Sequence, residues 1–256
     1  MSLVNLRMTQ GAIVSTFIPT DLSNLQLWLD STDASTVNSG SPVNTDPVTL
    51  WNDKSGNGNN FTGAGSVPTY VTGGIGGKPS MNFPSGHEWF DGGTTNLFTQ
   101  TSGYSIFFVL NLENISSIYR IMAQFAYVDA SNTPTFFFGA GISGMCTAMT
   151  SQGATWGQPA YSIPSDAVGI SSAYAWFYNG GGTTLTNYTA QAQFTNEVAS
   201  NNPLSSAVDY KNYIGNYNSS LFGFMGNISE ILVYNRQLNS TEIGQVNAYF
   251  RSKYGI

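Results

Sequence analysis

The sequence predicts one all-β sandwich domain that ends in a short α-helix. From Leu25 onward, short runs of β-branched and aromatic residues are separated by clusters of Gly, Asn, Ser and Pro, a pattern typical of sandwiches and barrels. Hydrophobic residues make up 41% of the chain and include 16 Phe and 14 Tyr, which is enough apolar material for a sizeable core. Because sandwiches of about 200–250 residues commonly form one unit, the 256 residues are expected to form a single domain.

Two of the predicted strands differ in their apolar pattern. The run Tyr104–Leu112 is apolar on both alternating faces, which indicates a central strand covered on both sides. The run Ile228–Asn235 alternates more cleanly, which predicts one polar edge facing solvent. In chain order, the predicted strands lie near Leu25–Leu29, Val48–Asn52, Ser80–Phe83, Tyr104–Leu112, Tyr119–Phe125, Thr135–Gly139, Gly141–Thr147, Ser172–Tyr178, Thr183–Ala190, Tyr210–Gly215 and Gly223–Tyr234.

Only the C-terminal end of the chain, about its last seventeen residues, has a helical pattern. Asn239 is a good N-cap and is followed three positions later by Glu242, so that each side chain can bond to a backbone amide of the first turn. Apolar residues then recur at helical spacing over Ile243–Tyr254. The basic residues Arg251 and Lys253 suit the negative end of the helix dipole.

The composition excludes several classes of partner. Only 9% of the residues are charged, far below the roughly 25% of an ordinary soluble domain. The net charge is −6 and no basic run is present, so nucleic acid is not expected as a partner. The single cysteine, Cys146, is expected to be a small buried residue or a loop thiol.

The N-terminal segment indicates an arm and no export signal. Residues Met1–Gln10 lack a basic leader before an apolar block and a small-residue cleavage site, and no apolar stretch reaches the roughly 18–20 residues of a membrane span. We therefore expect no signal peptide, no transmembrane segment and no membrane partner. Residues 1–21 are expected to form an apolar arm that is covered by its own domain or by a neighbouring subunit, with the domain itself over residues 22–256.

Three blocks in order along the chain carry a family resemblance. These are Leu-Gln-Leu-Trp-Leu-Asp at 25–30, Trp-Asn-Asp-Lys-Ser-Gly-Asn-Gly-Asn at 51–59, and Ile-Ser-Glu-Ile-Leu-Val-Tyr-Asn-Arg-Gln-Leu at 228–238 before the terminal helix. A Gly-Lys-Pro-Ser-Met-Asn-Phe segment at 77–83 lies between them. Over about residues 22–256 the chain resembles the concanavalin A-like lectin/glucanase superfamily, in its laminin G-like branch.

This resemblance implies a jelly roll of two antiparallel sheets with a short C-terminal helix. The superfamily contains lectins, hydrolases, adhesion modules and viral structural proteins, so the fold alone does not decide the function. Its hydrolases carry acidic residues at alternate positions of one strand, because glycoside cleavage needs two carboxylates on one face. In this sequence the acidic residues sit singly, and the closest pair is Asp30 with Asp33.

No catalytic residues are therefore expected. Glu88 and Asp91, beside the only histidine, His87, are the next candidates for chemistry. The alternative is a polar loop whose Trp89 and Phe90 pack on the edge of the sandwich.

No cofactor is expected, although a calcium ion is an open alternative. Laminin G-like domains often hold calcium at a loop rim, and Asp53, Asn57 and Asn59 offer oxygen atoms within seven residues. One carboxylate makes a weak site, and side chains that bond to their own turn explain the same residues. We expect Trp51 to lie in the core and the Asp53 carboxylate to cap the turn.

A glycan site, if the chain has one, is predicted in the Gly- and Pro-rich loop Thr155–Tyr161. This loop offers the aromatic rings of Trp156 and Tyr161 and the amide of Gln158, which together suit a sugar ring and its hydroxyl groups. The alternative is that these aromatic residues seal the open end of the sandwich.

The function predicted from the sequence is that of a non-enzymatic bacteriophage virion protein, either a capsid decoration protein or a tail-associated surface protein. A chain without an export signal, an apolar arm and a nearly uncharged surface all favour this prediction. Its partners would be other virion proteins and further copies of itself, with a trimer as the expected state, and its location would be the virion surface. The alternative is a lectin-like adhesion or receptor-binding module that binds a host-surface glycan.

Overall fold

The computed structural model describes residues 17–97, 103–113, 211–216 and 223–256 with their side chains. Between residues 120 and 198 it describes the backbone of strands β8 to β15. These strands are β8 (Arg120–Val128), β9 (Thr133–Gly141), β10 (Met145–Gln152), β11 (Thr155–Gly157), β12 (Ala160–Ser162), β13 (Ser171–Tyr178), β14 (Thr183–Thr189) and β15 (Ala192–Val198).

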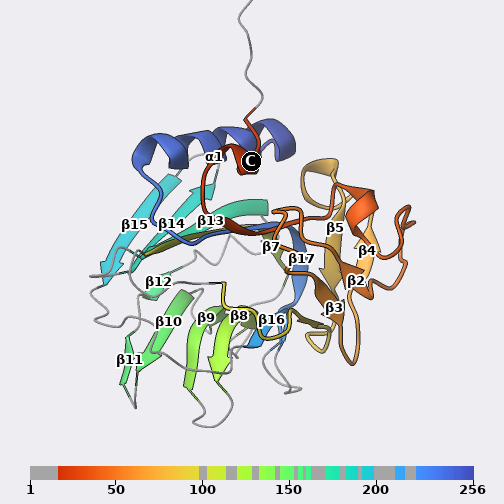
Figure 1. The fold of residues 1–256 in the computed structure, drawn as a ribbon, viewed down its shortest axis with the longest axis horizontal. Helices are drawn as coiled ribbons and strands as arrows, with labels where there is room; N and C mark the ends of the chain where they lie inside the picture. Colours follow the sequence, from red (N-terminus) through yellow and green to blue (C-terminus); the bar gives the residue numbers. More distant parts are fainter. Residues whose placement is uncertain are drawn as a thin grey trace, which may run out of the picture.

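Two antiparallel sheets form the body of the molecule (Figure 1). In the first sheet the strand order is β15-β14-β13-β7-β17-β5-β4, and β1 also pairs with β17. In the second sheet the order is β11-β10-β9-β8-β16-β6-β3-β2, and β12 pairs with β10. The remaining strands are β1 (Leu25–Asp30), β2 (Leu50–Trp51), β3 (Phe61–Gly63), β4 (Thr69–Val71), β5 (Ser80–Phe83), β6 (Phe90–Asp91), β7 (Tyr104–Leu112), β16 (Lys211–Ile214) and β17 (Gly226–Tyr234). The predicted two-sheet jelly-roll sandwich is confirmed.

Strand β7 is a central strand with the predicted bounds. It pairs with β13 on one side and with β17 on the other. Ile106 and Phe108 belong to the core between the two sheets, whereas Phe107 and Val109 belong to a second apolar cluster on the outer face of the first sheet. The helix α1 covers this outer cluster, so the expected double coverage of the strand is confirmed.

Helix α1 spans Ser240–Tyr254 and begins with the predicted cap. The Asn239 side chain accepts hydrogen bonds from the amides of Thr241 and Glu242, and the Glu242 carboxylate accepts one from the Asn239 amide. The helix ends at Gly255, whose left-handed φ of 72° is a conformation that glycine adopts without a steric penalty.

Strand β17 corrects one expectation from the sequence. Every residue from Ser229 to Tyr234 is buried, so the prediction that this strand turns a polar edge to solvent is wrong. The reason is its place in the sheet, between β7 and β1 and beneath α1. Its polar side chains, Ser229 and Glu230, instead bond to neighbouring segments of the protein.

The sequence pattern misses several short strands, and some strands that it does predict begin or end at other residues in the structure. Six strands that have three residues or fewer, or that lack an apolar pattern, are absent from the prediction: β3, β4, β6, β11, β12 and β15. The strand predicted near Gly141–Thr147 is β10, which begins only at Met145, and the strand predicted near Val48–Asn52 is reduced to β2.

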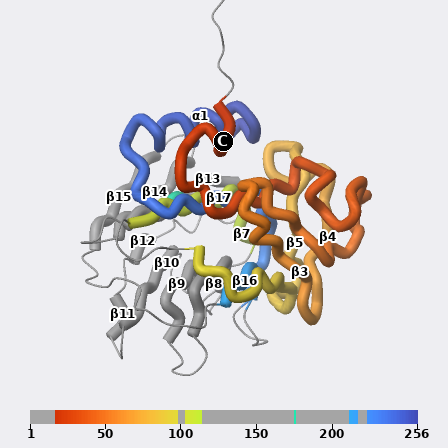
Figure 2. Tube along the Cα trace, in the orientation of Figure 1, coloured from red at the N-terminus to blue at the C-terminus, as the bar shows by residue number. Residues whose placement is uncertain are grey.

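The two ends of the described chain meet on the outer face of the first sheet (Figure 2). The ring of Phe17 meets that of Tyr249 on α1 edge-on, with centroids 6.2 Å apart. The Tyr234 hydroxyl of β17 donates to the Pro19 carbonyl, 3.0 Å away. The short 3-10 helices are η1 (Pro19–Asp21), η2 (Ala34–Thr36) and η3 (Ile75–Gly77). Residues 1–16, most of the predicted arm, lie outside the described residues.

Within the described portion of the chain, no helix has the length and apolar character needed to cross a bilayer.

Candidate functional site

A groove lies between the exposed side of α1 and the segments that flank β1. It is lined by Phe17, Ile18, Asp21, Leu22, Trp28, Asp30, Thr32, Asp33, Ala34, Ser35 and Lys54, and by Gln245, Ala248, Tyr249, Ser252 and Lys253 of α1. The groove has a volume of about 1270 Å³, somewhat above the roughly 300–1,000 Å³ of ordinary small-ligand sites. It therefore has room for a ligand of several linked rings.

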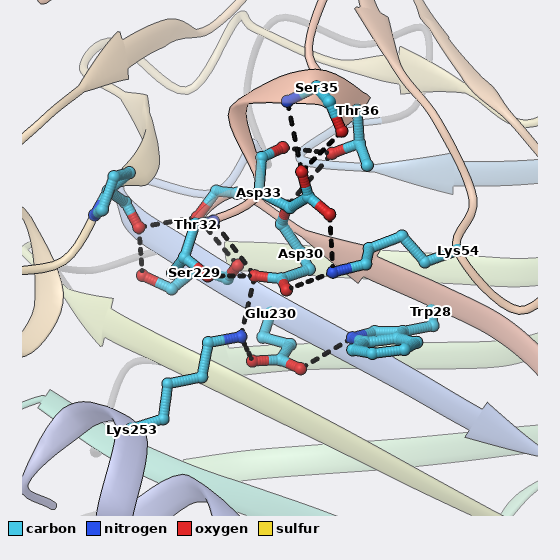
Figure 3. A network of polar contacts seen from close by, with 12 residues as sticks. Trp28, Asp30, Thr32, Asp33, Ser35, Thr36, Lys54, Ser229, Glu230 and Lys253 are labelled. Atoms are coloured by element: carbon cyan, nitrogen blue, oxygen red, sulfur yellow. Dashed lines mark hydrogen bonds and ion pairs between the residues drawn. The ribbon is translucent and has the colours of Figure 1, made fainter. Parts of the chain in front are cut away.

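Asp30, Lys54 and Lys253 line this groove and belong to a buried ion cluster, whose contacts are shown in Figure 3. Asp30 of β1 and Glu230 of β17 occupy directly opposed positions of the antiparallel pair. The ammonium group of Lys253 on α1 bonds to both carboxylates, at 2.8 Å from Asp30 Oδ1 and 2.7 Å from Glu230 Oε2. The cluster thus joins the first strand, the last strand and the C-terminal helix.

Both oxygens of the Glu230 carboxylate are saturated with donors. Trp28 Nε1 and the Tyr249 hydroxyl donate to Oε1, at 2.8 and 2.9 Å. Lys253 and the Tyr254 hydroxyl donate to Oε2, both at 2.7 Å. Four donors around one carboxylate match the ionised form, which only accepts hydrogen bonds.

A second lysine continues the cluster toward the open side of the groove. Lys54 Nζ lies 2.9 Å from an oxygen of Asp30 and 2.9 Å from one of Asp33. The same ammonium group stands 4.2 Å from the centre of the Trp28 ring, a distance at which a cation is attracted by the ring face. Thr32 adds two further hydrogen bonds to Asp30, from its amide and its hydroxyl.

The electrostatics of the two opposed carboxyl groups differ. Burial works against ionisation of Asp30, but Lys253 and Lys54 outweigh it and hold the pKa of Asp30 below its ordinary value. Burial and the negative charge of Asp30 raise the pKa of Glu230, although Lys253 acts in the opposite direction. Burial beside Glu230 raises the pKa of Tyr249 well above its ordinary value, so this phenol keeps its proton and remains a donor.

Both carboxylates of the cluster are almost completely closed to solvent. The Glu230 side chain is 0% exposed, so a ligand in the groove cannot reach it. Asp30 is 4% exposed and its oxygens already accept four hydrogen bonds. The expectation that the acidic residues sit singly is wrong for this pair, because sheet pairing unites residues from opposite ends of the sequence.

The side chains that are open to the groove are of a different kind. Phe17 is half-buried and its ring contacts the edge of Tyr249. Ser35, Gln245 and Ser252 are exposed and border the same space. Most of the remaining lining is apolar and includes Ile18 and Leu22 beside the aromatic rings, so the groove can bind a ligand that has apolar faces and some hydroxyl groups.

The glycan-binding residues predicted from the sequence lie elsewhere. Trp156 is in β11 and Tyr161 in β12, so two short strands occupy much of the expected loop. Both strands pair with β10, where Trp156 is opposite Ser151 and Tyr161 opposite Cys146. Their partners on β10 are five positions apart. Gln158 lies outside the described residues.

The segment His87–Asp91 forms turns and a short strand. Glu88 is 6% exposed, and its carboxylate accepts hydrogen bonds from two amides of the turn before it. Asp91 accepts one from the Gly93 amide at 2.7 Å. The ring of Trp89 packs edge-on against Tyr213. Each carboxylate therefore bonds to the backbone of its own turn.

The residues considered for calcium do not fit a calcium site. Asp53 accepts hydrogen bonds from the amides of Trp28 and Ser55 at Oδ1, and from the Ser55 hydroxyl and the Asn59 amide at Oδ2. The side-chain amides of Asn57 and Asn59 donate to carbonyl groups of β1. Asp53 therefore caps the turn, and Trp51 is fully buried in the core. Among the residues that the structure describes, no group of three or more His, Cys, Asp or Glu could hold a metal ion.

Comparison with known proteins shows similarity at the level of fold. No protein-family model matches the sequence, and no curated protein matches it. Among solved structures, domain 4 of AbnA, a GH43 extracellular arabinanase from Geobacillus stearothermophilus, solved with arabinotriose, has a TM-score of 0.60 at 16% identity. The match covers 88% of this chain and 98% of that domain.

Two larger proteins contain a similar region. Trypanosoma rangeli sialidase, solved with sialic acid, has a TM-score of 0.62 at 10% identity over 91% of this chain, which spans only 33% of the sialidase chain. The receptor-binding domain of a botulinum neurotoxin of mosaic serotype C/D also has a TM-score of 0.62 at 10% identity, over 88% of this chain and 50% of that one. At these identities the likeness establishes a β-sandwich of jelly-roll type. It gives no support to the laminin G-like branch or to a phage protein.

Proposed function

We propose that this protein is a non-enzymatic carbohydrate-binding module. The observation that carries the proposal is the groove beside α1. Asp30 and Lys253, which are ion-paired to each other, line the groove together with aromatic and aliphatic side chains, several hydroxyl groups and one amide. A preorganised concave site with a few polar groups is the usual form of a small-ligand site, and this mixture of groups suits sugars.

The ligands of structurally similar proteins support the same class. The arabinanase domain was solved with arabinotriose, the sialidase with sialic acid, and the toxin domain is a receptor-binding domain. The arabinanase domain bears most directly on the proposal, because this chain matches nearly all of it rather than a portion of a larger unit. These comparisons favour the lectin-like alternative over the virion role.

The state of the acidic pair supports the proposal of binding without cleavage. Glycoside hydrolysis needs one carboxyl group that donates a proton and a second carboxylate on the other side of the scissile bond. Glu230 is sealed beneath α1, and Asp30 is paired with two ammonium groups. Neither group is free to change its protonation with each turnover.

The test is a glycan array probed with the purified full chain. We expect retention of at least one class of oligosaccharide, and we expect that class to remain intact after prolonged incubation with the protein, as measured by chromatography of the reducing ends. Silence across a broad array overturns the proposal, and hydrolysis of the retained sugar overturns its non-enzymatic aspect.

The virion role, the location on a virion surface and the trimer remain predictions from the sequence alone. They predict that the purified chain forms a stable oligomer that dissociates when residues 1–20 are removed, as measured by sedimentation equilibrium.

A further inference from the structure

Resting on the proposed function, we infer that the groove beside α1 is the glycan site and that it takes neutral oligosaccharides while rejecting sialylated and other acidic ones. The sequence pattern favours a site near Trp156 instead. Two properties of the groove point to it, the charge of its lining and the chemistry of its open rim.

The lining carries an excess of negative charge. Three carboxylates, from Asp21, Asp30 and Asp33, border the groove together with two ammonium groups, from Lys54 and Lys253. Three negative against two positive charges leave a net charge of −1 in the lining, and Glu230 lies directly behind it. An acidic ligand would therefore enter a site of its own sign, which is the common way in which binding sites reject wrong partners.

Neither ammonium group in the lining is available to an acidic ligand. Lys54 lies between Asp30 and Asp33, at 2.9 Å from each. Lys253 donates to Asp30, to Glu230 and to the Tyr249 hydroxyl, which uses its three N–H donors. To pair with the carboxylate of sialic acid, either lysine would have to break an ion pair with a protein carboxylate. That protein carboxylate would then be left buried and unpaired.

The groups at the open rim of the groove favour a neutral oligosaccharide. The Asp33 carboxylate is 35% exposed and can accept hydrogen bonds from sugar hydroxyl groups. Gln245 and Ser252 are exposed along one stretch of α1, and the half-buried Phe17 ring offers an apolar surface beside Tyr249. The groove is also large enough for several linked rings. A neutral oligosaccharide satisfies these groups without bringing a charge.

The experiment compares two methionine substitutions on the same helix. Ala248 borders the groove, whereas Thr241 is exposed and does not border it. Methionine is a good helix former, so both variants are expected to fold, with melting temperatures that circular dichroism verifies. The probes are neutral arabinose, xylose, glucose and galactose oligosaccharides, together with the sialylated form of each galactose-terminated probe, and binding is measured by titration calorimetry.

We expect Ala248→Met to weaken binding of the neutral probe at least about tenfold, because the longer side chain occupies the groove, and Thr241→Met to leave it unchanged. We also expect the sialylated probe to bind more weakly than its neutral parent. Unchanged binding in Ala248→Met, or tighter binding of the sialylated form, overturns the inference. If Trp156→Ala abolishes binding and Ala248→Met does not, the groove inference fails while the proposed function stands. If the wild-type chain binds no glycan, the proposed function itself fails.

Discussion

Asp30 of β1 and Glu230 of β17 face each other across an antiparallel pair, and one ammonium group, that of Lys253, donates to both carboxylates. Like charges at directly opposed positions of a sheet normally destabilise it. Here the Lys253 ammonium group of α1 pairs with both carboxylates, which offsets their repulsion and attaches the helix to the sheet. The helix is therefore held by charge as well as by its apolar face.

The first prediction concerns that shared cation. Replacing it in Lys253→Met leaves two opposed carboxylates in a buried place, and breaking a buried pair of this kind typically costs about 3–5 kcal/mol. We expect a loss of this order in the free energy of unfolding, measured by urea denaturation at pH 7. The matched control is Arg251→Met on the same helix, where the residue is exposed and a change within about 0.5 kcal/mol is expected. Equal losses in the two variants would contradict the role given to Lys253.

The second prediction concerns acid stability. Because Asp30 has a lowered pKa in the folded protein, it favours ionisation in the folded state. Its contribution to stability is therefore present above its ordinary pKa of 3.8 and is lost as the pH falls through its folded value. Glu230 has a raised pKa, so its contribution has the opposite sign and declines as the pH rises above its ordinary 4.5.

We therefore expect Asp30→Asn to be less stable than the wild type at pH 7 and to lose less stability than the wild type between about pH 4 and pH 2. Urea denaturation at a series of pH values measures both quantities. Parallel curves for the two proteins over the acid range would show that Asp30 is not the group responsible.

The third prediction compares two neighbouring glycines, one where a side chain would strain only the backbone and one where it would also clash with α1. Gly76 and Gly77 both have a left-handed backbone, with φ of 58° and 71°. A methyl group at Gly76 would collide with the Tyr254 carbonyl at the end of α1, whereas one at Gly77 meets open space. Gly77→Ala is expected to cost roughly 1–2 kcal/mol, the usual penalty of this conformation, and Gly76→Ala clearly more. Thermal unfolding of the two variants measures the difference, and the idea fails if their melting temperatures coincide.

The fourth prediction tests the helix cap. The Asn239 side chain accepts hydrogen bonds from two amides of the first turn. Asn239→Ala is expected to lower the free energy of unfolding by about 1 kcal/mol, since a lost N-cap costs about that much. Ser240→Ala, at the exposed neighbouring position, is the control and should change little. A cap variant as stable as this control would refute the assignment.

Elements with a strong local signal were predictable from the sequence. The double apolar pattern of Tyr104–Leu112 identified β7 with its bounds, and the Asn239–Glu242 pair identified the start of α1. Both signals arise between residues that are close along the chain. The missed strands β3 and β6 contain three and two residues, too few for any periodicity to be visible in the sequence.

The ion cluster could not be predicted, because it depends on contacts between residues that are distant along the chain. Asp30, Glu230 and Lys253 come from segments far apart in the sequence, and nothing local indicates that they meet. Lys253 suits the helix dipole, but so does any basic residue near a helix end. The one available signal was a glutamate in the middle of the strongly apolar run Ile228–Tyr234, because a buried acidic residue requires partners.

Strand β17 comes late in the described chain but lies in the middle of the first sheet, and its partners β1, β5 and β7 all precede it. During synthesis these three strands leave the ribosome long before the strand that joins them. Until residues 226–234 have been translated, they present unpaired backbone edges, and the distant pairings then close slowly. Unpaired strand edges of this kind are the usual starting points of aggregation in incompletely folded chains.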